Sequence, residues 1–131
     1  MGTVRLEDFG RLMAVTKRDT IQPMTADDLP MVHALECAAQ ASPWSLEHFS
    51  AELDNPCSRV DLCRRNDELA GFICWWLVAG EVQIQNVATA PAFRRQGVAA
   101  SLLSHVFEQA RGSGFESAWL EVRVGNTPAI A

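Results

Sequence analysis

The sequence lacks any apolar stretch of membrane-spanning length and any excess of basic residues. Its longest apolar run, Phe72–Ala79, is far shorter than the roughly 20 residues of a transmembrane helix. The N-terminal Met1–Gly10 carries charges where a secretion signal would be apolar. A formal net charge of -5 disfavours a nucleic-acid-binding protein held mainly by phosphate contacts. We therefore expect a soluble cytoplasmic protein whose direct partner is neither a membrane nor a nucleic acid.

Cys-x-x-Cys pairs and closely spaced histidines are also missing. We interpret the cysteines as small buried side chains that are kept reduced. They are Cys37, Cys57, Cys63 and Cys74. The histidines lie far apart on predicted helices, at His33, His48 and His105. Because a metal site needs several ligands close together, the sequence predicts no metal site.

The length and composition fit one folded unit. A chain of 131 residues has room for one domain around one core. Its 48% hydrophobic and 21% charged residues are ordinary for a globular protein. Residues 1–18 show no clear period, and we interpret them as an N-terminal extension. The domain itself is expected to span residues 19–131.

Two helices are predicted in the first half of the domain, after a short strand at Thr20–Pro23. Thr25 and Asp28 match a capping box, and helical spacing of apolar residues then extends to about Gln40. Ser45 is a good N-cap for the second helix, which Asn55-Pro56 ends. The inner stripe of this second helix is expected to consist of Leu46, Phe49 and Leu53.

The second half is predicted to contain a run of strands interrupted by one long helix. Strands are expected at Arg59–Arg64, Leu69–Val78 and Glu81–Thr89, separated by short polar turns. A firm amphipathic stripe predicts a helix over Gln96–Arg111, and a last strand follows at Ala118–Val124. This order indicates a mixed α/β (α+β) domain, with a sheet flanked by helices.

The third strand contains an irregularity. Val82 and Ile84 point to one face, but the next large apolar residue, Val87, has the opposite parity. A period of two that slips phase predicts a β-bulge near Gln85-Asn86. A bulge leaves backbone groups unpaired, and such groups can bind a ligand.

The segment Arg94-Arg95-Gln96-Gly97-Val98-Ala99 leads from this strand into the long helix. The first amides of a helix have no internal partner, and with the helix dipole they favour an anion. Gly97 lets the backbone approach a bulky phosphate closely. From local physics alone, an ordinary helix start with surface arginines remains the alternative. The glycine spacing matches neither a Walker loop nor a Rossmann fingerprint.

The same segment resembles the Q/R-x-x-G-x-G/A signature of the GNAT acetyltransferase superfamily, with Ala99 where many members have a second glycine. The resemblance implies the GNAT fold, with a central mixed, mainly antiparallel sheet, and acetyl-CoA as co-substrate. It implies that the end of the bulged strand contacts the acetyl-cysteamine end of acetyl-CoA, through Val87, Ala88 and Thr89. It implies pyrophosphate contacts for the helix start, through Arg95, Gln96, Gly97, Val98, Ala99 and Ala100.

Further segments resemble the RimI-type alanine N-acetyltransferases. They are Pro43-Trp44-Ser45, Trp119–Arg123 and Asn126–Ala131. The resemblance implies acetyl transfer to the N-terminal α-amine of a protein, such as a ribosomal protein that begins with alanine. The transfer would occur by direct attack in a ternary complex. The oligomeric state is not indicated.

The resemblance gives three residues a role, and each has a simpler reading. Glu121 matches the proton acceptor, but spacing alone fits a strand carboxylate paired with Arg123. Asn126 matches a cofactor contact, or it is a turn residue after Gly125. Trp44 either shapes the acceptor pocket or packs on Phe49 as a hydrophobic staple.

Two rival functions remain open at this point. One is a GNAT enzyme acting on a small-molecule amine or amino acid, and the other is a non-catalytic acyl-CoA-binding module. The family's proton donor is a tyrosine shortly after the Asn126 segment, and this sequence contains no tyrosine. We expect the natural protein to continue beyond Ala131, so that the C-terminal part of the GNAT fold is missing here.

Overall fold

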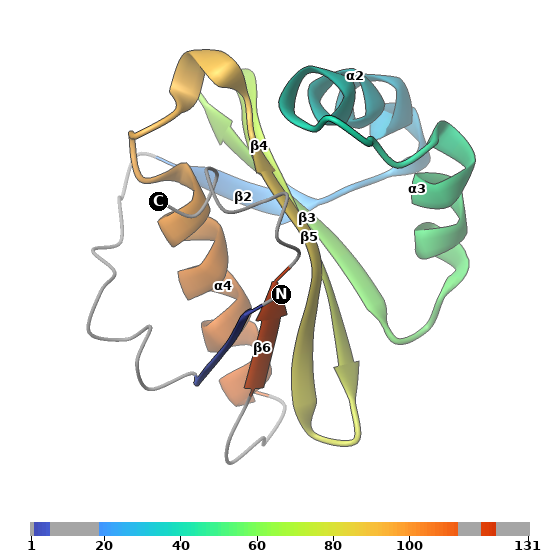
Figure 1. Cartoon of the computed structure of the whole chain (residues 1–131), viewed down its shortest axis with the longest axis vertical. Helices are drawn as coiled ribbons and strands as arrows, with labels where there is room; N and C mark the ends of the chain where they lie inside the picture. The colour runs from blue at the N-terminus through green and yellow to red at the C-terminus, as the bar shows by residue number, and fades with distance from the viewer. Residues whose placement is uncertain (1, 6–18, 113–118, 123–131) are drawn as a thin grey trace.

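The computed structural model describes residues 2–5, 19–112 and 119–122 (Figure 1). A four-stranded antiparallel sheet, in the order β2-β3-β4-β5, forms its centre. In Figure 1, α4 covers one face of this sheet and α2 and α3 cover the other. The strands are β1 (Gly2–Arg5), β2 (Thr20–Pro23), β3 (Ser58–Arg65), β4 (Glu68–Val78), β5 (Glu81–Thr89) and β6 (Trp119–Val122). The helices are η1 (Ala26–Asp28), α2 (Leu29–Ala39), α3 (Leu46–Asp54), η2 (Pro91–Phe93) and α4 (Val98–Gly112).

The predicted starts of the first two helices are confirmed, with one change of type, whereas the long helix was predicted from Gln96 and begins at Val98. The Thr25 amide donates to Asp28 Oδ2 at 2.8 Å, which is half of the predicted capping box. The box opens the short 3-10 turn η1, and α2 follows directly from it. Ser45 caps α3, since its Oγ accepts from the His48 amide at 3.1 Å. The rings of Trp44 and Phe49 lie 5.3 Å apart, as expected for a staple.

The predicted inner stripe of α3 is partly wrong. Phe49 is fully buried, but Leu46 and Leu53 are 37% and 39% exposed. Glu52 is buried instead, at 7% exposed. Its Oε1 accepts hydrogen bonds from Ser58 Oγ at 2.7 Å and from Trp76 Nε1 at 2.7 Å. A buried carboxylate with such partners is satisfied, and the hydrophobic pattern alone could not reveal those partners.

The meander β3-β4-β5 is joined by two short hairpin turns. Asn66 and Asp67 have φ of 55° and 65°, and Ala79 and Gly80 have φ of 51° and 79°. Positive φ at both central residues is typical of two-residue hairpins, because it matches the right-handed twist of the strands. The three strands fall within one residue of the predicted bounds at every end.

The predicted bulge in β5 is confirmed. Cys74 lies opposite Asn86, but the next residue of β4, Trp75, lies opposite Ile84, so Gln85 is the extra residue. The bulge restores the alignment of the apolar side chains. As a result, Val82, Ile84 and Val87 all belong to one core cluster despite their different parity.

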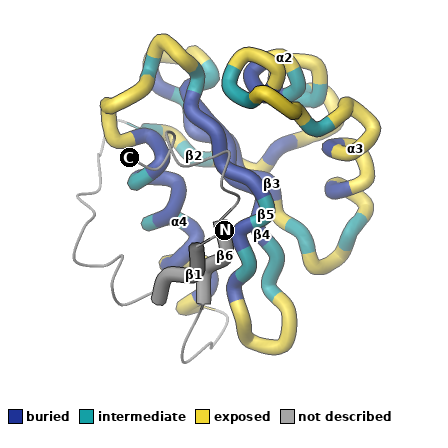
Figure 2. Tube along the Cα trace, viewed as in Figure 1, coloured by how far each residue is buried: buried dark blue, intermediate teal, exposed yellow. Residues whose placement is uncertain are grey.

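The central strands of the sheet are buried over most of their length (Figure 2). Apolar side chains pack on both faces of the sheet. Ile73 and Trp75 of β4 pack with the buried stripe of α4. Their neighbours Phe72 and Cys74 point to the other face and pack with α2 and α3. The alternation explains why β4 reads as a continuous apolar run, since both faces of this strand are covered. No helix in the described ranges is long and apolar enough to span a membrane.

The last predicted strand is present as β6, which pairs with β1 in a separate two-stranded antiparallel sheet. Glu121 lies opposite Thr3 in this ladder. In Figure 1, β6 runs beside β5. The ladders of the described residues do not join these two strands. The strand β1 lies inside the segment that we interpreted as an extension, where the sequence pattern indicated no strand.

The interpretation of the cysteines holds for half of them. Cys63 and Cys74 are buried in the sheet, whereas Cys37 and Cys57 are exposed. No disulfide is present among them, and all are free thiols within the described residues.

Candidate active site

The end of β5 and the start of α4 meet in the fold. Gly71 of β4 lies between them, opposite Thr89. A Cβ atom placed on Gly71 would lie 2.7 Å from the Ala88 carbonyl oxygen and 2.8 Å from Val98 Cγ1. Real Cβ atoms do not approach so closely, so a glycine is needed here. The structure therefore brings together two of the predicted contact regions, residues 87–89 and 95–100.

The predicted thioester contacts are buried in the sheet. Val87 and Ala88 are fully buried, and Thr89 is 4% exposed. The hydroxyl of Thr89 is buried and has no hydrogen-bond partner among the described residues. Because β5 is the last strand of the four-stranded sheet, its outer edge faces the neighbouring β6 rather than a hydrogen-bonded ladder. The backbone of residues 87–89 thus lies at the edge of the four-stranded sheet.

The turn before α4 has an unusual backbone. Arg95 has φ of 62° and Gly97 has φ of 81°. A positive φ is strained for arginine, and such strain often accompanies a functional site. The Ser101 amide donates to the Gly97 carbonyl at 3.0 Å, so the helical hydrogen bonds begin at Gly97. Residues 94–97 are exposed. Exposed residues thus lead directly into the amino-terminal end of α4, where unpaired helix amides favour an anion, whereas Val98 and Ala99 are buried.

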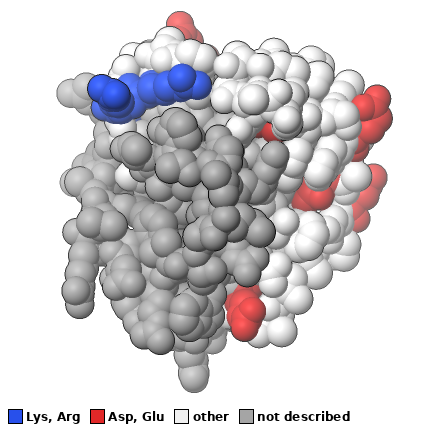
Figure 3. Space-filling model, in the orientation of Figure 1, with Lys and Arg blue, Asp and Glu red and all other residues white. Residues whose placement is uncertain are grey.

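Basic charge gathers at this turn. On the face shown in Figure 3, the Lys and Arg side chains form one band, above the connection from β5 to α4. Arg94 and Arg95 lie in this connection and are exposed. The sequence as a whole is acidic, with a formal net charge of -5. The local surplus of positive charge fits the pyrophosphate of a nucleotide coenzyme.

A buried ion pair between Arg65 and Asp19 contacts this turn. Arg65 Nε lies 2.7 Å from Asp19 Oδ1, and Arg65 Nη2 lies 3.0 Å from Oδ2. The third nitrogen, Nη1, donates to Gln96 through its carbonyl oxygen at 3.1 Å and Oε1 at 3.3 Å. Burial opposes ionisation of Asp19, but hydrogen bonds from Arg65, Ser101 and Cys63, together with the charge of Arg65, hold the pKa of Asp19 below its usual value.

A second buried carboxylate lies on the opposite face, at the bulge. Glu36 of α2 is fully buried. Its Oε2 accepts from the Trp44 amide at 2.9 Å and from Asn86 Nδ2 at 2.9 Å. Gln40 Nε2 also donates to Asn86 Oδ1 at 3.3 Å. These bonds attach the bulge of β5 to α2 and to the loop between α2 and α3.

Sequence reasoning missed the residues that support the site, namely Asp19, Arg65 and Glu36. Asp19 and Arg65 lie just outside predicted strands, and Glu36 lies inside a predicted helix. Charged residues at such places are usually solvated, and no local signal distinguishes these. Glu121 lies in β6, and its side chain is outside the described part of the structure, as is all of Asn126. Trp44 stacks on His48, with ring centroids 3.8 Å apart, in addition to contacting Phe49.

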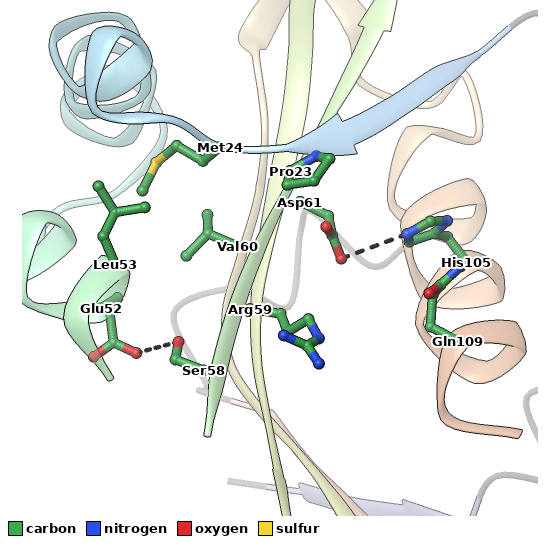
Figure 4. A pocket seen from close by; sticks show the side chains of 10 residues that line it. All are labelled: Pro23, Met24, Glu52, Leu53, Ser58, Arg59, Val60, Asp61, His105 and Gln109. Atoms are coloured by element: carbon green, nitrogen blue, oxygen red, sulfur yellow. Dashed lines mark hydrogen bonds and ion pairs between the residues drawn. The ribbon is translucent and has the colours of Figure 1, made fainter. Parts of the chain in front are cut away.

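A cavity of about 450 Å³ lies elsewhere, where β3 continues past the end of β2 (Figure 4). None of its lining residues belongs to the predicted site. The Glu52–Ser58 hydrogen bond and an ion pair of 3.5 Å between His105 and Asp61 lie in its wall. The described residues contain no group of three or more His, Cys, Asp or Glu side chains that could hold a metal ion.

The chain is similar to known acetyltransferases. The Acetyltransferase (GNAT) family matches residues 26–131. The [ribosomal protein bS18]-alanine N-acetyltransferase of Escherichia coli is 33% identical over 113 residues, which are 86% of this chain and 76% of that protein. A putative enzyme of the same name from Bacillus subtilis is 31% identical over 83% of this chain and 73% of that protein.

Solved structures give the same result. The crystal structure of the ribosomal-protein-S18-alanine N-acetyltransferase from Escherichia coli has a TM-score of 0.74 at 31% identity, covering 86% of this chain and 72% of that chain. The PaiA N-acetyltransferase from Thermoplasma acidophilum, solved with coenzyme A, has a TM-score of 0.67 at 14% identity, covering 85% and 83% of the two chains. At that identity the likeness shows the fold alone. The chain belongs to the GNAT family of acetyl-CoA-dependent acetyltransferases.

Proposed function

We propose that this protein transfers the acetyl group of acetyl-CoA to the N-terminal α-amine of a protein. The supporting observation is the 33% identity, over 86% of the chain, to the [ribosomal protein bS18]-alanine N-acetyltransferase of Escherichia coli. A ribosomal protein with an N-terminal alanine is therefore the acceptor to test first. The cytoplasmic location expected from the sequence agrees with such an acceptor and stays a prediction.

In this proposal the strained turn and the first turn of α4 bind the pyrophosphate of acetyl-CoA. The backbone amides from Arg95 to Ala100 would donate to it, and the exposed Gly97 leaves room for the phosphate oxygens. The end of β5, from Val87 to Thr89, would hold the acetyl-cysteamine end. Asn126 would contribute a further contact to the coenzyme. The buried Thr89 hydroxyl, which has no partner in the described structure, fits a site completed by a bound molecule.

The proposed chemistry is a direct attack. An ammonium cannot attack a thioester, so Glu121 would accept its proton, either directly or through a water molecule. The neutral amine then forms a bond to the thioester carbonyl carbon and the carbon–sulfur bond breaks. The second amine proton passes to the departing sulfur, directly or through water, so that the products are the amide and CoA thiol. A backbone amide of β5 would stabilise the negative charge that develops on the carbonyl oxygen. Holding both substrates in one complex supplies much of the rate enhancement.

The proposal is tested by measuring CoA thiol release. The acceptors are a peptide with the alanine-first N-terminus of bS18, the same peptide with its α-amine blocked, and a panel of small amines and amino acids. We expect release with the free peptide only. Turnover of small amines and not of the peptide would identify a small-molecule acetyltransferase. Acetyl-CoA binding without release from any acceptor would identify a non-catalytic module.

Two variants test the proposed proton acceptor and the proposed pyrophosphate contact separately. Glu121→Gln should lower turnover by about 10²–10⁴-fold while leaving the affinity for acetyl-CoA unchanged. Gly97→Val should weaken acetyl-CoA binding in calorimetric titrations, because a side chain there is both strained and in the way of the phosphate. Glu81→Gln, at the exposed start of β5, is the control and should change neither quantity. Unchanged turnover of Glu121→Gln between pH 6 and 9 would mean that another group accepts the proton.

A further inference from the structure

Arg65 is the last residue of β3, and its guanidinium group joins three separate parts of the chain. Two of its nitrogens form a bidentate ion pair with Asp19, which precedes β2. The third reaches both the backbone and the side chain of Gln96 in the turn before α4. The residue is only 9% exposed. Such a fork of donors cannot be replaced by a lysine.

The contact with Gln96 determines the direction of one amide in the turn. A peptide bond is planar and trans, so its C=O and N–H point in opposite directions. The Gln96 carbonyl oxygen points inward to Arg65 at 3.1 Å. The amide of Gly97 belongs to the same peptide unit, so it must point away from Arg65. The Gln96 side chain is fixed as well, since its Nε2 donates to the Ala92 carbonyl at 3.2 Å.

Stability of the helix alone does not explain an arginine at this place. The start of an α-helix carries a partial positive charge, and a guanidinium group beside it is unfavourable. Asp19 removes this conflict, since its carboxylate neutralises Arg65 at 2.7 Å. In the ion pair, Arg65 still donates hydrogen bonds to Gln96, while its positive charge no longer repels the start of the helix. The arrangement therefore fits a residue selected for orienting the turn.

We propose that Arg65 is a positioning residue for the coenzyme, holding the turn so that the Gly97 amide faces the pyrophosphate of acetyl-CoA. Asp19 in turn holds Arg65 in place. This inference rests on the proposed pyrophosphate site. It adds to that site two residues that do not touch the coenzyme and lie far from the turn in the sequence.

Loss of Arg65 should affect binding of the pyrophosphate part of the coenzyme and not of the thioester part. If Arg65 orients only the pyrophosphate-binding amides, its loss should weaken acetyl-CoA but not S-acetylpantetheine, which has the same thioester and no phosphate. A merely structural role would impair both substrates to the same extent. The ratio of kcat/KM for the two substrates therefore separates the two explanations.

The experiment compares Arg65→Gln and Arg65→Lys with wild type. The control is Arg64→Gln, because Arg64 is the neighbouring residue and pairs with Asp28 at 3.4 Å, away from Gln96. Since Arg65→Gln leaves Asp19 buried without its partner, the double variant Asp19→Asn/Arg65→Gln is included in case the single variant does not fold. Acetyl-CoA affinity is measured by calorimetry, and kcat/KM is measured for both acetyl donors with the peptide acceptor.

We expect the Arg65 variants to bind acetyl-CoA roughly tenfold or more weakly, as for the loss of one charge-assisted hydrogen bond. The preference for acetyl-CoA over S-acetylpantetheine should fall by a similar factor, and Arg64→Gln should behave as wild type. Equal affinities in all variants, or equal losses with both donors, would overturn the inference. If wild type itself does not bind acetyl-CoA, the proposed coenzyme site fails instead.

Discussion

Buried carboxylates attach the two small helices to the rest of the molecule. Glu36 of α2 accepts from the Trp44 amide and from Asn86, and Glu52 of α3 accepts from Ser58, Cys74 and Trp76. A buried charge is unfavourable unless donors surround it, and here the donors come from the loop and the sheet. Each carboxylate therefore fixes its helix at a defined place, which apolar contacts alone do less specifically.

The buried Glu52 carboxylate should make the stability of the protein depend on pH. Burial opposes its ionisation, but hydrogen bonds from Trp76 and Ser58 outweigh this and lower the pKa of Glu52 below its usual 4.5. A lowered pKa in the folded state means that the carboxylate stabilises the protein above about pH 4.5. This stabilisation is lost as the pH falls through the lower, folded-state value. Glu52→Gln should therefore reduce the free energy of unfolding by about 1–3 kcal/mol near pH 7.

The measurement is urea denaturation of wild type and Glu52→Gln between pH 7 and pH 3. The difference between the two proteins should be largest at neutral pH and should shrink below about pH 4.5. Glu47→Gln, in the exposed first turn of the same helix, is the control, with an expected change of about 0.5 kcal/mol or less. A difference that stays constant over the whole range would contradict the assignment of this effect to the Glu52 charge.

At the scale of elements, local patterns predict much of the fold. The strands β3, β4 and β5, the bulge at Gln85 and the capped helix starts follow from periodicity and turn residues. The error in α3 has a physical cause, since a carboxylate at Glu52 can be buried when a tryptophan and a serine from other strands donate to it. Strand β1 was not expected, because its four residues carry no distinctive pattern.

Gly71 decides how closely β5 and α4 can approach. The Cβ atom of an alanine there would lie 2.7 Å from the backbone oxygen of Ala88, which cannot move independently of the sheet. Gly71→Ala should therefore destabilise the protein by about 1–3 kcal/mol, as overpacking does. The same displacement would separate residues 87–89 from the start of α4, so the affinity for acetyl-CoA should fall as well. Urea denaturation and calorimetric titration measure the two effects.

Gly112→Ala provides the control for this prediction. Gly112 ends α4, and nothing lies within 4 Å of a Cβ atom placed there. The change should therefore be within about 0.5 kcal/mol of wild type. If Gly71→Ala is as stable as Gly112→Ala, the close approach at Gly71 does not limit the packing of β5 against α4.

At the scale of the whole molecule, the candidate site combines a local motif with distant supports. The turn before α4 was predictable because its residues are adjacent in the sequence and match a family signature. Its support was not, because Asp19 and Arg65 are 46 positions apart and Gln96 follows 31 positions later. Only the folded sheet brings these three residues together. Sequence patterns of this kind therefore predict what binds a ligand better than what holds the binding residues in place.

The cysteines of the chain bear on whether the acetyl group passes through a covalent acetyl-enzyme. A covalent acetyl-enzyme would need a nucleophile such as a cysteine thiolate. Burial, followed by the charge of Asp19, raises the pKa of the Cys63 thiol to about 12, and burial raises the pKa of Cys74. Neither thiol is therefore reactive near neutral pH. The remaining thiols, Cys37 and Cys57, are exposed and lie outside the candidate site.

Direct attack in a ternary complex therefore predicts two results. Initial rates measured at varied acetyl-CoA and peptide concentrations should give intersecting double-reciprocal lines, because both substrates must be bound before any product leaves. The double variant Cys37→Ser/Cys57→Ser should retain kcat within about twofold, since these side chains take no part in the reaction. Parallel lines, or an acetyl group found on a cysteine after incubation with acetyl-CoA alone, would instead require a covalent intermediate. In that case Glu121 would activate the second half of the reaction rather than the whole of it.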